Sequence, residues 1–459
     1  MQMGYAKYND IDCVFNEEQG NIFLIAKDKK DSYNLLKADK RKNYFFEYAK
    51  NDCKYCYAYI EDSISNIFDK TIQLKAKFII KNFCDKPISY MEIIGEDIDD
   101  FFSPSKYFYE LSKKGLLKDE NLIYKQNKVD EWKINFEDKE ITISLSFGNI
   151  LKRGIASDLK LHARLCLSFD ETRDYEFIYR VYSIVTRFLN IVFYKCDSSN
   201  NNIDLSIKKN NGVLSYTGKL IDCKLISKVF KERQEINYNN YANFIERIFQ
   251  FCADNPKLSM KQFATRGIKY NGRDYTSTDF LNIFSAFEDE CEAEQKLYKK
   301  ADDKLIIDKK SELISTIDKL EYKNKEEKEF IWQAKEKIFK LGTEFGQKAK
   351  IINAYKVLSK ALKSSIKDIF YLHKLTNYEI LDDKDIDYFA KFLAKTRGKI
   401  AHSGNQLEFT DKEAQIIQFF EILVYSQLLK RAKLNDSEIE LIIGSVFGVN
   451  QLMFLKSLE

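Results

Sequence analysis

The distribution of proline limits what this chain can fold into more than any other feature of its sequence. Among 459 residues there are only three prolines, Pro87, Pro104 and Pro256. Proline breaks the interior of a helix, because it lacks an N–H and its ring clashes with the preceding turn. The stretch 257–459 therefore permits long helices, and its apolar residues recur with a period close to 3.6. Helices are predicted at about 241–253, 277–301, 309–322, 324–341, 347–373, 383–402, 410–433 and 436–457. A capping box is predicted at Thr410-Asp411-Lys412-Glu413, where the helix at 410–433 begins.

Strand patterns dominate roughly the first 170 residues. Apolar and polar residues alternate over 71–80 and 159–169, which is typical of strands with one buried face. A hairpin is predicted over 132–147, because two alternating runs flank the turn 137–140. Such strands predict an antiparallel sheet, a sandwich or an open barrel.

The change from one pattern to the other divides the chain. A helix with a strongly apolar face is expected at 175–196, and turn-rich segments follow it. The boundary is expected between about 225 and 260, which gives a β-rich domain over 1–235 and a helical domain over 236–459. The predicted fold class is α+β, with an N-terminal antiparallel sheet or sandwich followed by an all-α bundle.

Charge and histidine content argue against two broad classes of protein. The chain has 74 Lys or Arg against 70 Asp or Glu, a net charge of +4, which is unlike a protein that coats nucleic acid over its whole surface. Any nucleic-acid site must be a local patch. The three histidines, His162, His373 and His402, are too scattered to form a local His-rich metal site.

One Cys-x2-Cys pair, Cys53 and Cys56, raises the alternative of a zinc site completed by Cys13 and Cys84. The pair falls in an alternating segment, 53–60, where odd spacing puts the two side chains on opposite faces. There is no second Cys-x2-Cys pair. Buried free thiols are the favoured interpretation, and neither a metal nor another cofactor is expected.

Nothing in the sequence pattern directs the chain to a membrane. The N-terminal residues lack the basic segment and apolar run of a secretory signal. The most apolar stretch, 177–194, carries Arg180 and Arg187, which favours a buried amphipathic helix over a membrane span. Nine cysteines without a secretion signal are typical of reduced thiols. A cytoplasmic location without membrane partners is therefore predicted.

The most informative motif is Thr396-Arg397-Gly398-Lys399-Ile400-Ala401-His402, near the end of the helix expected at 383–402. Arginine and histidine together suit RNA cleavage without a metal, in which the 2′-hydroxyl attacks the neighbouring phosphate. Histidine can move protons near neutral pH, because its unperturbed pKa is about 6.5. Arginine stays protonated and offers a planar fork to phosphate oxygens. Arg397 and His402 are therefore candidate catalytic residues.

The spacing alone does not establish a site. Residues five apart on a regular helix point about 140° away from each other. The plain alternative is a solvent-facing arginine and a histidine near a helix C-terminus, where a cation is favoured. Gly398 offers one way to turn Arg397 and His402 toward a common groove, by loosening the helix between them.

The context of the motif resembles the HEPN superfamily of ribonucleases, whose signature is Arg-x4-6-His in a small helical bundle. It is most similar to the ApeA-type HEPN proteins of prokaryotic antiphage defence, whose motif reads Thr-Arg-Asn-x-Leu-x-His, with Gly398 here in place of that Asn. In that group an earlier helix has an apolar run ending in Ala-x-Glu, which 280–288 resembles. The group also has a polar break before its last helix, which 428–438 resembles.

This resemblance implies a metal-independent endoribonuclease that acts as the toxic effector of an antiphage abortive-infection system. The substrate would be RNA of the host or the phage, such as tRNA. It also implies a homodimer or higher oligomer in which two motifs face each other. One motif histidine per chain favours the same two-copy site, because a base and an acid are both needed. The β-rich domain would be a sensing or regulatory domain, with a phage protein as a candidate trigger.

Other side chains are assigned to the same site. Glu288, in an acidic run that continues to Glu294, is the candidate for orienting Arg397 or His402. His373 is interpreted as structural, since a lone helical histidine usually serves packing. Three lysines that flank the motif are candidate RNA-binding residues: Lys391, Lys395 and Lys399.

A second function fits the same segment. Degenerate HEPN domains are non-catalytic dimerisation or RNA-binding modules, and Gly398 in the usual Asn position keeps this alternative open. A third interpretation is a sensor subunit for another effector. An NTPase or a serine hydrolase is disfavoured, because the sequence has no P-loop and no Gly-x-Ser-x-Gly segment.

Overall fold

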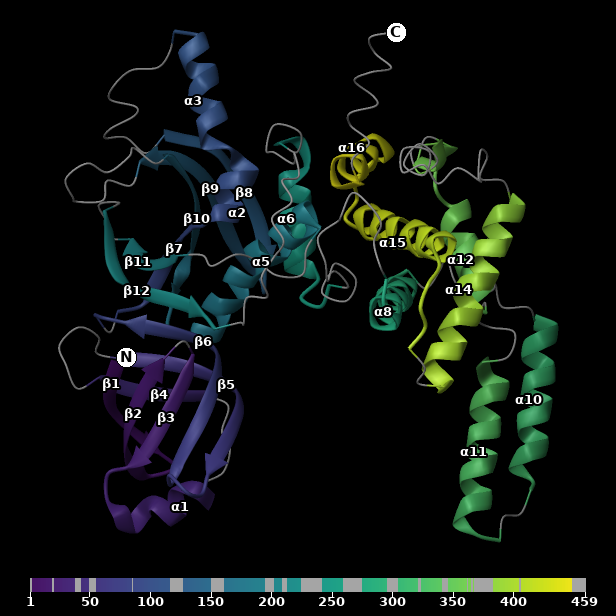
Figure 1. Ribbon diagram of the computed structural model, residues 1–459, viewed down its shortest axis with the longest axis horizontal. Coiled ribbons are helices and arrows are strands. Elements are labelled where there is room, and N and C mark those ends of the chain that lie inside the picture. The colour runs from purple at the N-terminus through teal and green to yellow at the C-terminus, as the bar shows by residue number, and fades with distance from the viewer. Residues whose placement is uncertain are drawn as a thin grey trace. The chain divides into compact units, whose positions relative to one another are not determined.

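A computed structural model gives the fold of the chain (Figure 1). Contacts divide the chain into two compact units, Met1–Leu258 and Ser259–Glu459. The first is built on an antiparallel sheet and the second is helical, so the predicted α+β fold class is confirmed. The structure describes residues 2–18, 20–37, 43–48, 55–84, 86–115, 127–149, 161–194, 202–208, 213–223, 242–258, 275–294, 304–320, 323–340, 346–360, 362–364, 366, 383–403 and 406–447.

Every strand described in the first unit belongs to a single antiparallel sheet. The bounds are β1 Gln2–Tyr8, β2 Ile11–Glu18, β3 Asn21–Ala26, β4 Asn43–Tyr48, β5 Tyr55–Asn66, β6 Thr71–Asn82, β7 Ile88–Ile94, β8 Asn127–Phe136, β9 Lys139–Asn149, β10 Leu161–Thr172, β11 Asn202–Lys208 and β12 Leu214–Asp222. The strand order is β3-β2-β1-β4-β5-β6-β12-β11-β7-β10-β9-β8.

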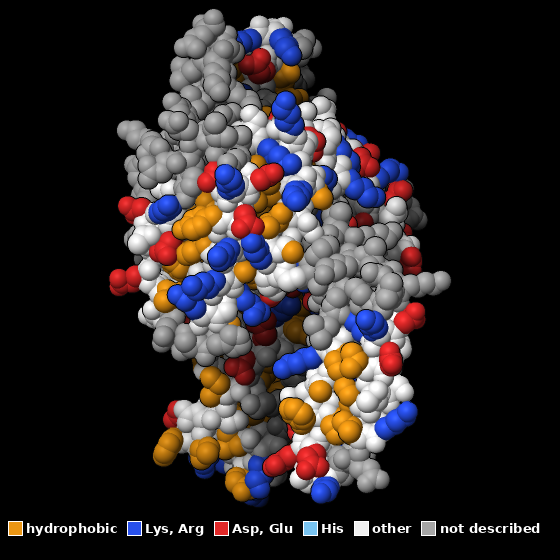
Figure 2. All heavy atoms as spheres, turned by 90° about the vertical axis from the view of Figure 1, so that its right-hand side faces the viewer, with side chains coloured by type: hydrophobic (Ala, Val, Ile, Leu, Met, Phe, Trp, Pro, Cys, Tyr) orange, Lys and Arg blue, Asp and Glu red, His pale blue; other side chains and the backbone are white. Residues whose placement is uncertain are grey.

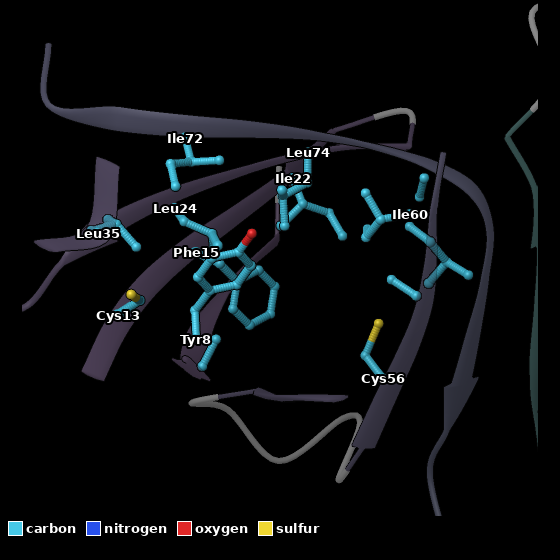
Figure 3. Packing of buried hydrophobic residues seen from close by; sticks show 14 of the residues in the cluster. Tyr8, Cys13, Phe15, Ile22, Leu24, Leu35, Cys56, Ile60, Ile72 and Leu74 are labelled. Atoms are coloured by element: carbon cyan, nitrogen blue, oxygen red, sulfur yellow. The ribbon is translucent and has the colours of Figure 1, made fainter. Parts of the chain in front are cut away.

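The first six strands close on themselves. In addition to its neighbour β2, β3 pairs with β6, so that β1 to β6 form a ring. Alternate residues of these strands point into the ring, and helix α1 (Ser32–Lys37) adds Leu35 to the same core. Tyr8, Phe15 and Leu24 lie among the buried side chains there (Figure 3). The apolar residues at every second position of these strands thus form the core inside the ring.

Strand β6 belongs to both parts of the sheet. Its first half pairs with β3, whereas its second half, from Phe78 to Asn82, pairs with β12. From β12 the sheet continues as an open layer to β8. The free edge of β8 is covered at Asn135, whose N–H donates to Gln250 Oε1 at 2.8 Å and whose carbonyl accepts from Gln250 Nε2 at 3.0 Å. One amide side chain therefore pairs backbone groups that an open edge leaves exposed.

The hairpin predicted over 132–147 is formed by β8 and β9, in which Trp132 faces Ile143 and Ile134 faces Ile141. Its turn is shorter than the expected 137–140, because Lys139 already pairs with Phe136. Glu137 and Asp138 have φ values of 51° and 60°. Positive φ at both central residues is the geometry of a type I′ turn, which matches the twist of the two strands.

Helices cover the open layer: α2 (Glu96–Phe102), α3 (Pro104–Lys113), α5 (Tyr175–Phe193) and α6 (Ile245–Asp254). The apolar stretch around α5 is a buried helix, as predicted. Phe188 of α5 stacks on Phe249 of α6 with 4.1 Å between ring centroids, and Arg187 Nε donates to the Cys252 carbonyl at 2.9 Å. These contacts place α6 in the first unit, which therefore extends to Leu258, within the boundary region expected at 225–260 but beyond the division drawn at 235.

The helices of the second unit are α8 Ser277–Ala293, α10 Lys304–Asp318, α11 Lys325–Lys340, α12 Gln347–Lys356, α14 Asp383–Ser403, α15 Asp411–Arg431 and α16 Asp436–Phe447. The helix predicted at 347–373 is interrupted after Lys356. Ser359 starts a new turn there, because its hydroxyl accepts from the Leu362 N–H at 3.1 Å and so acts as a cap.

Aromatic side chains hold α8, α12, α14 and α15 together. The Phe420 ring of α15 lies 5.3 Å from Phe284 and 5.0 Å from Phe287 of α8, centroid to centroid. On the other side of α15, Phe419 contacts Tyr355 of α12 and Phe389 of α14. A capping box at Thr410, in which its hydroxyl accepts from the Glu413 N–H, starts α15 as the sequence predicts.

Candidate functional site

The motif segment occupies the last two turns of α14. Two acids in its first turn, Asp383 and Asp385, favour the helix N-terminus, and apolar residues at helical spacing, such as Phe389 and Leu393, are buried. The helix is continuous from Asp383 to Ser403, so it is not broken at Gly398. The idea that Gly398 loosens the helix is therefore wrong for this structure.

Arg397 contacts α8, and through Glu288 it is linked to α12. Its Nη2 lies 3.2 Å from Glu288 Oε1 on α8, and the same oxygen accepts from Gln347 Nε2, on the first residue of α12, at 2.7 Å. The guanidinium also lies over the Phe284 ring of α8, 6.0 Å from its centroid. The contact between Glu288 and Arg397 agrees with the role predicted for Glu288, while that role in catalysis stays a prediction.

The Arg397–Glu288 pair is half-exposed, with 36% of the arginine side chain and 33% of the glutamate side chain accessible. The arginine side chain is therefore partly open to solvent. Only one of the five N–H donors of arginine is needed for Glu288, which leaves others to receive an anion. The Glu288 carboxylate thus orients the Arg397 guanidinium, and the Gln347 amide in turn holds the carboxylate.

The direction of Glu288 is set by a second ion pair on α8. Two residues further on, Glu290 is 2% exposed and accepts two hydrogen bonds from Arg431 of α15, at 2.8 Å and 2.9 Å. Because residues two apart lie on different sides of a helix, Glu290 binds α15 while Glu288 is presented to α12 and α14. This bidentate contact fixes the rotation of α8 about its axis.

The three candidate RNA-binding lysines do not lie beside Arg397. All three are exposed. The three lysines recur every four residues and form one stripe along α14. This stripe lies about 160–240° around the helix axis from Arg397. Position 402 continues this stripe, three residues beyond Lys399, although the side chain of His402 is outside the described residues. Arg397 and the lysines are thus separated by the helix itself.

The other two histidines are accounted for differently. His162 lies on β10, as expected for a strand residue, with Nδ1 2.7 Å from Asp99 Oδ2 of α2. Asp99 Oδ1 also accepts from the Ala163 N–H at 2.7 Å, so this pair ties α2 to the sheet. His373 falls outside the described residues.

No group of His, Cys, Asp and Glu side chains within the described ranges has the geometry of a metal site. Of the cysteines considered for zinc, Cys13 and Cys56 are buried free thiols and Cys84 is an exposed one, whereas Cys53 lies outside the described residues. Burial raises the pKa of the Cys13 thiol to about 11, so it is protonated near neutral pH.

Gln347 is the residue that sequence reasoning missed. It directly follows Gly346, which has no side chain to cap α12, and its amide reaches Glu288 on a helix more than fifty residues earlier. No local motif marks such a residue, because a glutamine is common at helix N-termini. Its contact depends on how α8 and α12 pack.

Known proteins do not identify this arrangement. No protein-family model, no curated protein and no solved structure matches the chain. Among the helices that the structure describes, none has the length and apolar character needed to cross a membrane. The site therefore has to be interpreted from its own geometry.

The conformation at Gly398 makes one prediction about stability. A Cβ atom added there meets no other atom within 4 Å. Gly398→Ala should therefore raise the free energy of unfolding by about 0.5–1 kcal/mol, because alanine loses less backbone entropy in a helix. Chemical denaturation measures the change, with Ala401→Gly on the same helix as a control that should shift it the opposite way. A lower stability for Gly398→Ala would show that residue 398 is not in a regular helix.

Proposed function

We propose that the chain is a cytoplasmic, metal-independent endoribonuclease of the HEPN type, the toxic effector of a prokaryotic antiphage abortive-infection system. The observation that supports this best is the contact of Arg397 with Glu288, whose carboxylate is itself held by Gln347, on the surface of a helical bundle. An arginine held in a fixed direction, yet half-exposed, suits the binding of a phosphate whose charge increases in the transition state.

The chemistry assigns different tasks to the two motif residues. In cleavage by the 2′-hydroxyl, a base removes the hydroxyl proton, the oxygen attacks the adjacent phosphorus, and the bond to the 5′-oxygen breaks as an acid donates a proton to it. His402 is the motif residue that can carry these protons. Arg397 would bind the non-bridging phosphate oxygens, and Glu288 would act as its positioning residue.

A second copy of the chain is part of this proposal. On one continuous helix, Arg397 and position 402 are about 140° apart, so a single α14 does not present both to one phosphate. Two copies would bring two arginines and two histidines to one RNA. The first unit would restrain this activity until a phage protein binds it, since an unrestrained ribonuclease is toxic to its host.

One observation favours the alternative of a non-catalytic RNA-binding or dimerisation module. The exposed stripe formed by Lys391, Lys395 and Lys399 is on the opposite side of α14 from Arg397. Such a stripe can bind a phosphate backbone without bringing it to Arg397. In this case the Arg397–Glu288 pair would only connect α14 to α8.

The two functions differ in the products they predict. The purified chain, incubated with single-stranded RNA in EDTA, should yield fragments with 2′,3′-cyclic phosphate and 5′-hydroxyl ends, because the 2′-hydroxyl is the nucleophile. Electrophoresis and end-specific labelling identify these ends. Loss of cleavage in EDTA, or fragments with 5′-phosphates, contradicts the proposed mechanism. Tight RNA binding without any cleavage supports the non-catalytic alternative.

A further inference from the structure

Helices α10 and α11 form a hairpin that lacks a core of its own. The two helices contact each other, and their half-buried apolar residues are Ile314 and Ile317 on α10 and Ile331, Ala334 and Ile338 on α11. None of the described side chains of the two helices is buried. Two helices alone seldom bury enough apolar surface to be stable, so such a hairpin normally packs against further helices.

Large hydrophobic side chains of this hairpin are in contact with solvent. Leu313 and Leu320 are 53% and 55% exposed, Phe330 is 73% exposed and Trp332 is 62% exposed. Figure 2 faces the side on which α10 and α14 are drawn in Figure 1, and orange hydrophobic side chains are visible at its surface. Exposed apolar residues gathered on one element indicate an interaction surface.

The ion pair between Lys335 and Asp318 shows which of these side chains share a side of the hairpin. Leu313 precedes Asp318 by five residues and Phe330 precedes Lys335 by five, which is about 140° around each helix. Both therefore point away from the side of the ion pair. Leu320 lies just beyond the end of α10 at Asp318, so helix geometry does not assign it to either side. Trp332 is three residues from Lys335 and belongs to the ion-pair side. We call the side with Leu313 and Phe330 the apolar side.

Charges beside Phe330 are arranged for contact with an identical helix. Glu326 precedes Phe330 by four residues and Lys337 follows it by seven, so all three lie on one stripe of α11. Both charged residues are exposed. Eleven residues separate them, about 16 Å along the axis, so they do not pair within one chain. In an antiparallel pair of α11 helices, each Glu326 would meet the Lys337 of the other copy.

We propose that the apolar side of the α10–α11 hairpin binds the same side of a second copy of the chain, with the two α11 helices antiparallel. The four helices would bury Leu313 and Phe330 of both copies, as in a four-helix bundle. A two-fold axis near Phe330 produces two Glu326–Lys337 pairs, one at each end of the aromatic contact. This inference does not depend on ribonuclease activity, because it concerns the mass of the assembly.

Substitutions on the two sides of the hairpin test this interface. Light scattering on the full-length chain should give at least twice the mass of one chain for wild type. Leu313→Asp with Phe330→Asp should halve that mass and weaken self-association at least about tenfold. Trp332→Asp is the matched control on the ion-pair side and should keep the wild-type mass. A monomeric wild type, an unchanged mass for the double variant, or an equal effect of Trp332→Asp each overturns the proposal.

A charge exchange tests the antiparallel arrangement without removing hydrophobic residues. Glu326→Lys and Lys337→Glu should each weaken self-association, because two like-charged contacts then replace two ion pairs. An equal mixture of the two single variants should restore the wild-type mass, since every contact in the mixed dimer has opposite charges. Circular dichroism should match wild type for every variant, because the residues are exposed. If the mixture associates no better than the single variants, the antiparallel arrangement is wrong.

Discussion

Alanine at His402 or at Arg397 should each lower the rate of RNA cleavage by about two to four orders of magnitude. For His402 the loss follows from removal of the group that carries protons. For Arg397 it follows from removal of the charge that balances the phosphate. Single-turnover cleavage of a labelled RNA in EDTA measures both rates.

Matched variants separate these roles from a loss of folding. Arg397→Lys retains a positive charge but not the planar fork, so it should cleave faster than Arg397→Ala and slower than wild type. Lys356→Ala, an exposed change at the end of α12, should cleave at the wild-type rate. Unchanged thermal unfolding shows that the catalytic variants are folded. Wild-type cleavage by both alanine variants would exclude the proposed mechanism and favour the non-catalytic alternative.

Loss of Glu290 should give the largest change in stability. Glu290→Ala leaves Arg431 without its bidentate partner in a site where only 15% of its side chain is exposed. Removal of one partner from a buried ion pair typically destabilises a protein by about 3–5 kcal/mol. Urea denaturation followed by circular dichroism should therefore show a strongly lowered midpoint for the helical unit.

Two controls define the origin of that effect. Glu292→Ala removes an exposed acid of the same helix and should change the free energy of unfolding by less than about 0.5 kcal/mol. Replacing both partners, with Glu290→Met and Arg431→Leu, should recover much of the loss, because no unpaired charge stays buried. If Glu290→Ala were no more destabilising than Glu292→Ala, the ion pair would not be what fixes α8 to α15.

Local patterns in the sequence predicted the local structure well. Alternation located the β8–β9 hairpin, and the capping box at Thr410 located the start of α15, because each depends on neighbouring residues. The closure of β1 to β6 into a ring could not be predicted, because β3 and β6 pair across more than forty residues. The pattern of a strand does not say which other strand it will pair with. The assignment of α6 to the first unit depended in the same way on Phe188 and Phe249, which are far apart in the sequence.

The candidate site shows the same division. Arg397 was found from a motif and Glu288 from its place in an acidic helix, and the structure brings these two together. Gln347 was not found, because only the packing of α12 against α8 brings its amide to Glu288. The lysines of α14 were placed beside Arg397 by their closeness in sequence, but a helix turns residues two apart to different faces.

The shared strand β6 has a consequence for how the N-terminal unit can be divided. The second half of β6 pairs with β5 of the ring and with β12 of the open layer, so no break in the chain separates the two parts without removing a strand from one of them. A shortened chain that keeps one part intact should therefore need β6 in full. Limited proteolysis within 71–82 should release no fragment that stays folded alone.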